Sequence, residues 1–259
     1  MCTLTVYKST DRLLATMNRD EALTRAPESP PKIHDIPGGG QWIAPHDSAK
    51  GGTWTGANSY GVIACLLNAY LPGESLLPDT TGRYKSRGKI IPAVLESGNV
   101  DAAIAYIENS LDPENYPSFN LLIFGPGIGR CITWLRQGEL VWQDVDEAWT
   151  LRSSSGWDSR EVKAWREEIF SEWIASGEEM VDHLPKFHLY QESGREDWSP
   201  LMKRPWAATR SVTQVEVDLV IGETTLRYWP QPHPDSQHPE TVDTIPCVSG
   251  SMPPADLEV

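Results

Sequence analysis

The chain has 259 residues, of which 39% are hydrophobic and 22% charged. This is the composition of a folded, water-soluble protein, and the length suits one domain with a sizeable core. Lysine and arginine number 22 against 36 aspartate and glutamate residues, so the formal net charge is -14. An acidic field of this size repels nucleic acid and anionic lipid, which makes both poor candidate partners.

No targeting or membrane-spanning segment is evident in the sequence. The first 20 residues include five charged ones, and the longest apolar runs, such as residues 62–67, are too short to cross a bilayer. The four cysteines, at positions 2, 65, 131 and 247, are widely spaced, which predicts neither a disulfide framework nor a zinc site. We therefore expect a protein of the reducing cytoplasm.

The N-terminal part of the chain has a β-rich pattern. Residues 1–7 and 12–17 predict a hairpin, because two short β-runs flank a polar turn. Residues 22–40 contain four prolines and three successive glycines, and we expect a loop there. A second pair of strands is expected at residues 52–57 and 61–67.

Helices, further strands and a tail are expected after residue 90. Apolar spacing predicts helices near residues 91–95, 100–107 and 159–175, and strands at 119–124, 131–135, 140–142, 212–221 and 225–229. The last thirty residues contain seven prolines and neither lysine nor arginine. This pattern predicts a domain over residues 1–229 and an extended, Pro-rich acidic tail over 230–259. Strands and helices in this order indicate an α+β fold with stacked sheets.

Cys2 is the first candidate for chemistry. A residue as small as cysteine at position 2 permits removal of Met1, which leaves a free α-amine beside the thiol. That amine has an ordinary pKa of about 7.7 to 8.0 and can take the proton of the thiol at neutral pH. A nearby cation would lower the pKa of the thiol further. The alternative is a buried, inert cysteine.

Charged residues end the second strand of the predicted hairpin. A hairpin returns its far end to its start, so Arg19 and Asp20 are expected near Cys2. Arg19 would hold the thiolate by charge, and Asp20 would bind the protonated α-amine. The alternative is a solvated charge pair at a strand end.

A glycine-rich block precedes a strand that ends in a polar residue. The glycines of Gly51-Gly52-Thr53-Trp54-Thr55-Gly56 permit sharp turns and close backbone approach. Asn68 ends an otherwise apolar strand, and its amide is a candidate oxyanion donor. The alternative role for Asn68 is a strand-end cap.

Several blocks together resemble a known family. They are Met1-Cys2-Thr3, Asn18-Arg19-Asp20-Glu21, the Gly-Gly-Thr-Trp-x-Gly block, the strand ending at Asn68, Phe119-Asn120-Leu121-Leu122 and Thr209-Arg210-Ser211. In this order and spacing they are similar to the NRDE family, also called the transport-and-Golgi-organisation family. The resemblance spans roughly residues 1–215.

The resemblance implies an N-terminal-nucleophile hydrolase fold, a four-layer α-β-β-α sandwich. It also implies kinship with penicillin V acylases, bile salt hydrolases and acid ceramidase-like amidases. On that mapping Cys2 resembles their nucleophile, Arg19 and Asp20 their first-strand pair, and Asn68 their oxyanion asparagine. Arg210 resembles a late arginine that supports the thiolate site. These enzymes usually have a further asparagine in mid-chain, whereas the corresponding stretch here, residues 152–155, reads Arg-Ser-Ser-Ser.

The expected activity is hydrolysis of an amide or related acyl bond through an acyl-thioester on Cys2, with no cofactor and no metal. Trp42 and Trp54 would line an apolar acyl pocket, although core packing is the alternative for each. The histidines show no zinc-like pattern. The alternative function is a non-catalytic haem- or lipid-binding or trafficking protein on the same fold, involved in Golgi or mitochondrial organisation. The missing mid-chain asparagine favours that alternative.

Overall fold

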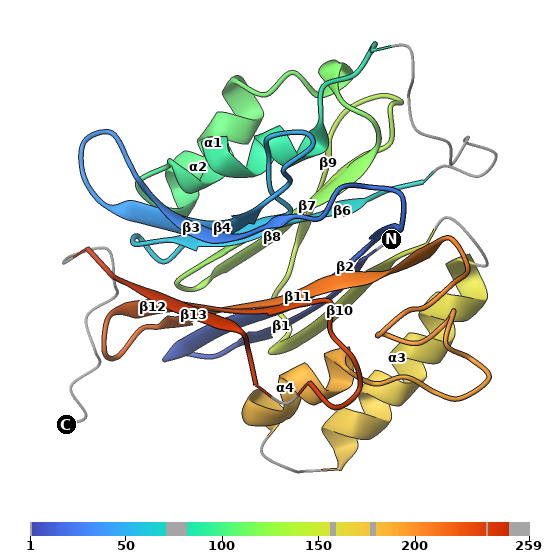
Figure 1. Ribbon diagram of the computed structural model, residues 1–259. Helices are drawn as coiled ribbons and strands as arrows, with labels where there is room; N and C mark the ends of the chain where they lie inside the picture. Colours follow the sequence, from blue (N-terminus) through green and yellow to red (C-terminus); the bar gives the residue numbers. More distant parts are fainter. Residues whose placement is uncertain (1, 71–81, 156–158, 177–179, 237, 249–259) are drawn as a thin grey trace.

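The computed structural model describes residues 2–70, 82–155, 159–176, 180–236 and 238–248. Two β-sheets lie face to face, and helices cover the outer face of each sheet (Figure 1). The layers therefore run helix, sheet, sheet, helix, as the resemblance implies.

The first sheet contains both the first and the last strand of the described chain. Its six strands follow the order β10-β1-β2-β11-β12-β13. They are β1 (Cys2–Lys8), β2 (Arg12–Ala22), β10 (Trp149–Ser154), β11 (Ala207–Asp218), β12 (Glu223–Pro230) and β13 (Thr241–Pro246). All neighbours are antiparallel. The N-terminal strand β1 thus lies between β2 and β10.

The second sheet runs in chain order from β3 to β9. Its strands are β3 (Ser29–Asp35), β4 (Gln41–His46), β5 (Thr55–Asn58), β6 (Ile63–Asn68), β7 (Phe119–Gly125), β8 (Ile128–Trp134) and β9 (Val141–Asp144). The expected strands at 52–57, 61–67 and 119–124 correspond to β5, β6 and β7.

Four α-helices form the outer layers of the described chain (Figure 1). Helices α1 (Ile90–Leu95) and α2 (Val100–Asn109) cover the second sheet, and α3 (Ser159–Ala175) and α4 (Met180–His188) cover the first. Two short 3-10 helices are η1 (Arg87–Lys89) and η2 (Pro113–Asn115). None of the described helices is long and apolar enough to cross a membrane.

Strand alternation sorts side chains between the layers. In β1, Leu4 and Val6 join the apolar core between the sheets, whereas Thr3 and Thr5 face the side of α3 and α4. The position of a residue along β1 therefore decides whether its side chain faces the core between the sheets or the polar layer beneath α3 and α4.

The expected loop over residues 22–40 is wrong for Ser29–Asp35, which form β3. Pro30 and Pro31 cannot donate to a sheet ladder, but β3 is an edge strand with a neighbour on one side only. The register also shifts between Ser29 and Lys32, where the prolines lie. An edge position with a bulge thus accommodates both prolines.

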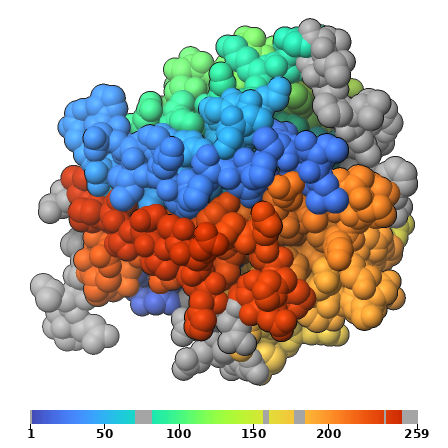
Figure 2. Space-filling view, viewed as in Figure 1, coloured from blue at the N-terminus to red at the C-terminus, as the bar shows by residue number. Residues whose placement is uncertain are grey.

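Part of the expected tail belongs to the first sheet. Residues Thr241–Pro246 form β13, which pairs with β12. Beyond it, the Val248 N–H donates to the Ser59 carbonyl at 2.7 Å. Figure 2 shows this red C-terminal part of the chain lying along the blue segment of the second sheet. Residues 249–259 of the predicted tail lie outside the described residues.

Candidate active site

Cys2 begins β1 at the point where three strands meet. Its register partners are Arg19 in β2 and Ser154 in β10. The Cys2 nitrogen donates a hydrogen bond to Ser154 Oγ at 3.0 Å. The antiparallel return of β2 brings Arg19 beside Cys2, as the sequence predicts for a hairpin.

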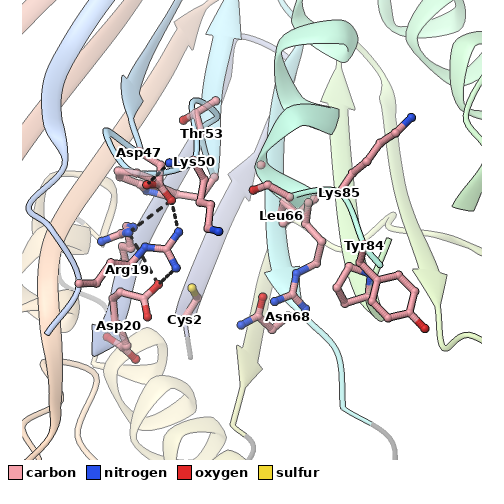
Figure 3. Close-up of a pocket in the computed structure, with 17 residues that line it drawn as sticks. Cys2, Arg19, Asp20, Asp47, Lys50, Thr53, Leu66, Asn68, Tyr84 and Lys85 are labelled. Atoms are coloured by element: carbon pink, nitrogen blue, oxygen red, sulfur yellow. Dashed lines mark hydrogen bonds and ion pairs between the residues drawn. The ribbon is translucent and has the colours of Figure 1, made fainter. Parts of the chain in front are cut away.

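A pocket of about 260 Å³ opens above Cys2. Figure 3 shows two groups of side chains that face each other across it, with Cys2 between them. One wall, from β2 and the loop after β4, includes Arg19, Asp20, Asp47 and Lys50; the other, from the end of β6 and the segment before α1, includes Leu66, Asn68, Tyr84 and Lys85. Four of the five predicted catalytic residues, Cys2, Arg19, Asp20 and Asn68, therefore line one pocket.

The Cys2 thiol is held in its neutral form. Burial raises its pKa, and the negative charge of Asp20 acts in the same direction. The hydrogen bond from the Asp20 backbone N–H and the charge of Arg19 lower the pKa, but by less. A base in the site must therefore take the proton of the thiol when the sulfur attacks.

Arg19 is surrounded by three carboxylates. Its guanidinium lies 3.0 Å from Glu28, 3.7 Å from Glu21 and 3.8 Å from Asp47. It also lies 4.7 Å above the ring of Trp54. These contacts fix Arg19 at the pocket wall, while the carboxylates offset part of its charge. Arg19 and Trp54 were predicted from the sequence as site residues, whereas Glu28 and Asp47 were not.

Asp20 belongs to a polar layer on the α3 side of β2. Thr209 Oγ1 donates to Asp20 Oδ1 at 2.7 Å. Burial raises the pKa of the Asp20 carboxyl, and the positive charges of Arg166 and Arg204 oppose this shift. The two arginines thus favour the ionised carboxylate that would bind an α-ammonium group.

Arg166 is a buried residue that the sequence analysis missed. It lies in α3 with 0% exposure. Its guanidinium donates to Thr3 Oγ1 at 2.6 Å and to the carbonyls of Trp198 and Ser199 at 2.7 and 2.8 Å. All three acceptors are neutral, so its charge acts on its surroundings, which include Asp20 and Cys2. One signal was available, because Arg166 follows Val162 by four residues on the buried stripe of the helix.

Asn68 lies across the pocket from Arg19 (Figure 3). It is the last residue of β6, as the sequence predicted. Its Nδ2 donates to Tyr70 Oη at 3.0 Å. A primary amide has a second N–H, which can serve an oxyanion in the pocket.

The glycine-rich block sets the shape of one wall. A Cβ on Gly52 would lie 2.5 Å from the Gly88 backbone, and one on Gly88 would lie 2.9 Å from the Thr53 carbonyl. The Thr53 N–H donates to the Gly88 carbonyl at 3.0 Å. The predicted close backbone approach is therefore confirmed between the loop after β4 and η1.

Trp42 does not line the pocket, so its predicted role needs correction. It lies in β4 on the face toward α1 and α2, where it stacks on His34 with ring centroids 4.0 Å apart. The next residue, Ile43, faces the core between the sheets. Alternation along β4 therefore directs Trp42 away from Cys2, whereas Trp54 does line the pocket.

Arg210 also lies outside the pocket lining. The register of β11 against β2 passes from Thr209 to Ser211, so Arg210 is the bulged residue. Its Nη1 contacts the Ala22 carbonyl at 3.4 Å. Because of this bulge, Thr209 rather than Arg210 contacts Asp20.

Ser154 occupies the place opposite Cys2 where the related enzymes were expected to supply an asparagine. The stretch at residues 152–155 lies in β10 and at its end, beside β1. The Ser154 hydroxyl oxygen accepts a hydrogen bond from the Cys2 nitrogen. Among the described residues, no group of three or more His, Cys, Asp or Glu is arranged to hold a metal ion.

The layer order and the two stacked antiparallel sheets are those of the N-terminal-nucleophile hydrolase fold. A Caenorhabditis elegans ortholog of N-acylethanolamine-hydrolyzing acid amidase aligns with a TM-score of 0.51 at 13% identity, covering 83% of this chain and 92% of that one. A mutant of the conjugated bile acid hydrolase from Clostridium perfringens aligns with a TM-score of 0.54 at 11% identity, covering 95% and 92%. At such low identity the likeness shows the fold alone.

The chain belongs to the Transport and Golgi organisation 2 family, whose model matches residues 1–208. The family resemblance expected from the sequence is thereby confirmed. No curated protein sequence matches the chain.

Proposed function

We propose that this protein, once Met1 is removed, hydrolyses an amide bond with Cys2 as its nucleophile. One observation carries the proposal: the Cys2 nitrogen and thiol lie at the base of a pocket, with Arg19 and Asp20 beside them and Asn68 opposite. The two solved structures compared above are named as hydrolases, one of N-acylethanolamines and one of conjugated bile acids. Their names support this reaction class.

The first step acylates Cys2. The sulfur attacks the amide carbon and forms a C–S bond, while the proton of the thiol passes to the α-amine of Cys2. Asn68 Nδ2 donates to the oxyanion of the tetrahedral intermediate. The C–N bond then breaks, and the α-ammonium gives its proton to the departing nitrogen.

The second step releases the acid. The α-amine takes a proton from water, and the hydroxyl attacks the thioester carbon. The C–S bond breaks, the sulfur recovers the proton, and a carboxylic acid leaves. Asp20, whose ionised form Arg166 and Arg204 favour against the effect of burial, would hold the α-ammonium in place during both steps. The neutral resting thiol fits this route, because the α-amine removes its proton during the attack.

The test is acylation of the purified protein by a p-nitrophenyl ester, followed by intact mass. The protein should come from its native host or be prepared with Cys2 as the first residue. We expect loss of Met1 and one acyl group on Cys2, formed at neutral pH and lost again through hydrolysis. Cys2→Ala should take up no acyl group.

A chain with an additional residue left before Cys2 is the matched control. It keeps the thiol but replaces the α-amine by a peptide nitrogen, so acylation should fall by about 10²- to 10⁴-fold. Retention of Met1 in the native host would contradict the proposal. Acylation of Cys2 no faster than that of Cys131 would contradict it as well.

Non-catalytic binding on the same fold is the second candidate function. The serine at position 154 favours it, because the related amidases were expected to have an asparagine in this stretch and one catalytic role is then left without a residue. Titration with haem and with fatty acids, followed by tryptophan fluorescence, tests it. Saturable binding by a protein that retains Met1 would support this candidate over the hydrolase.

A further inference from the structure

We infer that the substrate carries an anionic group, such as a carboxylate, close to the amide bond that is cleaved. This inference rests on the proposed function, because it concerns the same pocket. The chain has a net charge of -14, yet five of its 22 basic residues line the pocket against three of its 36 acidic ones. The basic residues are Arg19, Arg25, Lys50, Lys85 and Arg87; the acidic ones are Asp20, Glu21 and Asp47.

Two of the pocket carboxylates are already engaged by arginine. Glu21 lies 3.1 Å from Arg25, and Asp47 forms an ion pair with the same guanidinium. Both also lie within 4 Å of Arg19. With Glu28, which lies 3.0 Å from Arg19, the cluster holds two arginines and three carboxylates, so only one negative charge is left unbalanced at this wall, against the three basic residues Lys50, Lys85 and Arg87.

The lysines of the pocket have no such partners. In the described part of the chain, neither Lys50 nor Lys85 has a carboxylate within ion-pairing distance. Both are exposed at the pocket, on opposite walls (Figure 3). Their positive charge is therefore available to a ligand that enters between the walls.

Arg87 extends this positive field toward the candidate oxyanion donor. Its Nη1 donates to the Ser118 carbonyl at 2.8 Å, which holds the side chain in place. Its charge acts on the Tyr70 hydroxyl, and that hydroxyl accepts the hydrogen bond from Asn68. An anionic group bound near Arg87 would thus lie on the Asn68 side of Cys2.

The size of the pocket agrees with a small anionic part of a larger substrate. Its volume of about 260 Å³ is below that of most sites for drug-sized ligands, which is about 300–1,000 Å³. The charged lining favours the polar half of an N-acyl amino acid over its acyl chain. A neutral N-acylethanolamine would leave the basic residues without a partner.

The first experiment compares iodoacetate with iodoacetamide as probes of Cys2. The two reagents have nearly the same size and differ in charge, so the ratio of their rates does not depend on the thiolate fraction. We expect the ratio of the iodoacetate rate to the iodoacetamide rate to be larger at Cys2 than for free cysteine, by on the order of tenfold at low salt. The excess should shrink as salt screens the field.

Variants that remove the charges of the pocket lysines test whether these residues cause the higher ratio. The double variant Lys50→Gln, Lys85→Gln should bring the ratio toward that of free cysteine, because the ratio does not depend on how the lost charges change the thiolate fraction. Lys89→Gln is the matched control, because Lys89 is exposed in η1 but does not line the pocket. A wild-type ratio equal to that of free cysteine would overturn the inference and leave the proposed function intact.

If neither reagent labels Cys2, the absence of labelling would count against the proposed function alone. A binding measurement then tests the inference. Cys2→Ala would then be titrated with N-decanoylglycine and with N-decanoylethanolamine, followed by tryptophan fluorescence. Tighter binding of the anionic compound, lost in the lysine double variant, would support the inference. Equal binding, or none, would overturn it.

Discussion

Replacement of Asn68 should lower the rate of acylation without lowering stability. It is half-buried at the end of a strand, and its described side-chain bond is to Tyr70. Loss of an oxyanion donor lowers rates by about 10²- to 10³-fold. We therefore expect Asn68→Ala to slow acylation of Cys2 by that factor with little change in the free energy of unfolding.

Asn120→Ala is the control for that experiment. Asn120 lies opposite Leu67 in the neighbouring strand and accepts a hydrogen bond from Thr133, outside the pocket lining. Its replacement should leave the acylation rate unchanged. Equal rates for wild type and Asn68→Ala would remove Asn68 from the proposed mechanism.

Arg166 should matter for both stability and the charge of Asp20. Arg166→Met leaves three buried acceptors without their donor and removes a positive charge near Asp20. We expect the free energy of unfolding to fall by about 3 kcal/mol, measured by urea denaturation. The pKa of Asp20 should rise further, so acylation should be lost at a higher pH than in wild type as the pH falls.

Arg160→Met serves as the control on the same helix, because Arg160 is exposed. It should change the free energy of unfolding by less than about 0.5 kcal/mol. An Arg166→Met protein with wild-type stability and an unchanged pH profile would show that the charge of Arg166 has no role at this site.

The site residues that one hairpin or one strand end places were predicted from the sequence. Those that distant segments of the chain contribute were missed. Cys2, Arg19 and Asp20 follow from one hairpin, and Asn68 from the end of one strand. Thr209 and Arg166 reach Asp20 from segments more than 140 residues away, and no short pattern encodes such a contact. Arg210 was misassigned because a bulge shifts the register by one residue, which the sequence does not reveal.

At the scale of elements, α4 is attached to the first sheet through a buried histidine. His188 Nε2 accepts from the Thr5 hydroxyl at 2.7 Å, and its Nδ1 contacts Asn18 Oδ1. Asn18 Nδ2 in turn donates to the His188 carbonyl at 2.9 Å. These partners suit the neutral ring with its proton on Nδ1. Burial and the charge of Arg166 lower the pKa of His188 to about 3.

This histidine makes stability depend on pH. The folded pKa lies below the ordinary value of 6.5, so the unfolded chain binds the proton first as the pH falls. Its contribution is complete above pH 6.5 and is lost progressively toward pH 3. Between pH 7 and pH 5 we expect His188 to account for a decrease of about 2 kcal/mol in the free energy of unfolding.

Urea denaturation at the two pH values measures this decrease. His188→Gln cannot titrate, so its decrease should be smaller than that of wild type by the same amount. His233→Gln, at an exposed position, should behave as wild type. Equal pH dependence in wild type and His188→Gln would contradict the expected shift.

The elements that the sequence predicted are those with strong periodicity or apolar content. The strands β1, β2, β5, β6 and β7 and the helices α2 and α3 fall in this group. The edge strands β3 and β13 were missed, because β3 contains two prolines and β13 lies in a Pro-rich acidic stretch, whereas the edge strand β9 was predicted. β10 was also missed, since its Trp-Thr-Leu-Arg-Ser-Ser sequence has mixed polarity on both faces. Pairing with a neighbouring strand, which is β4 for β3, β12 for β13 and β1 for β10, makes these segments strands rather than local propensity.

At the scale of the whole molecule, β13 joins the two sheets at one edge. Ile245 is buried in the core between the sheets. β13 contacts β3 and β4 of the second sheet as well as β12 of its own (Figure 2). The last strand therefore closes the apolar core and covers the edge of β12.

Truncation after Pro230 tests whether this segment belongs to the domain. It removes Ile245 and leaves the β12 edge unpaired, so we expect the free energy of unfolding to fall by about 2–5 kcal/mol. The exposed edge should also promote association, visible by size-exclusion chromatography. Truncation after Val248 keeps β13 and is the matched control. If truncation after Pro230 leaves stability and monomer content equal to those of the control, residues 231–248 are dispensable and the domain ends near residue 229. A large loss confined to the shorter chain would instead extend the domain to β13.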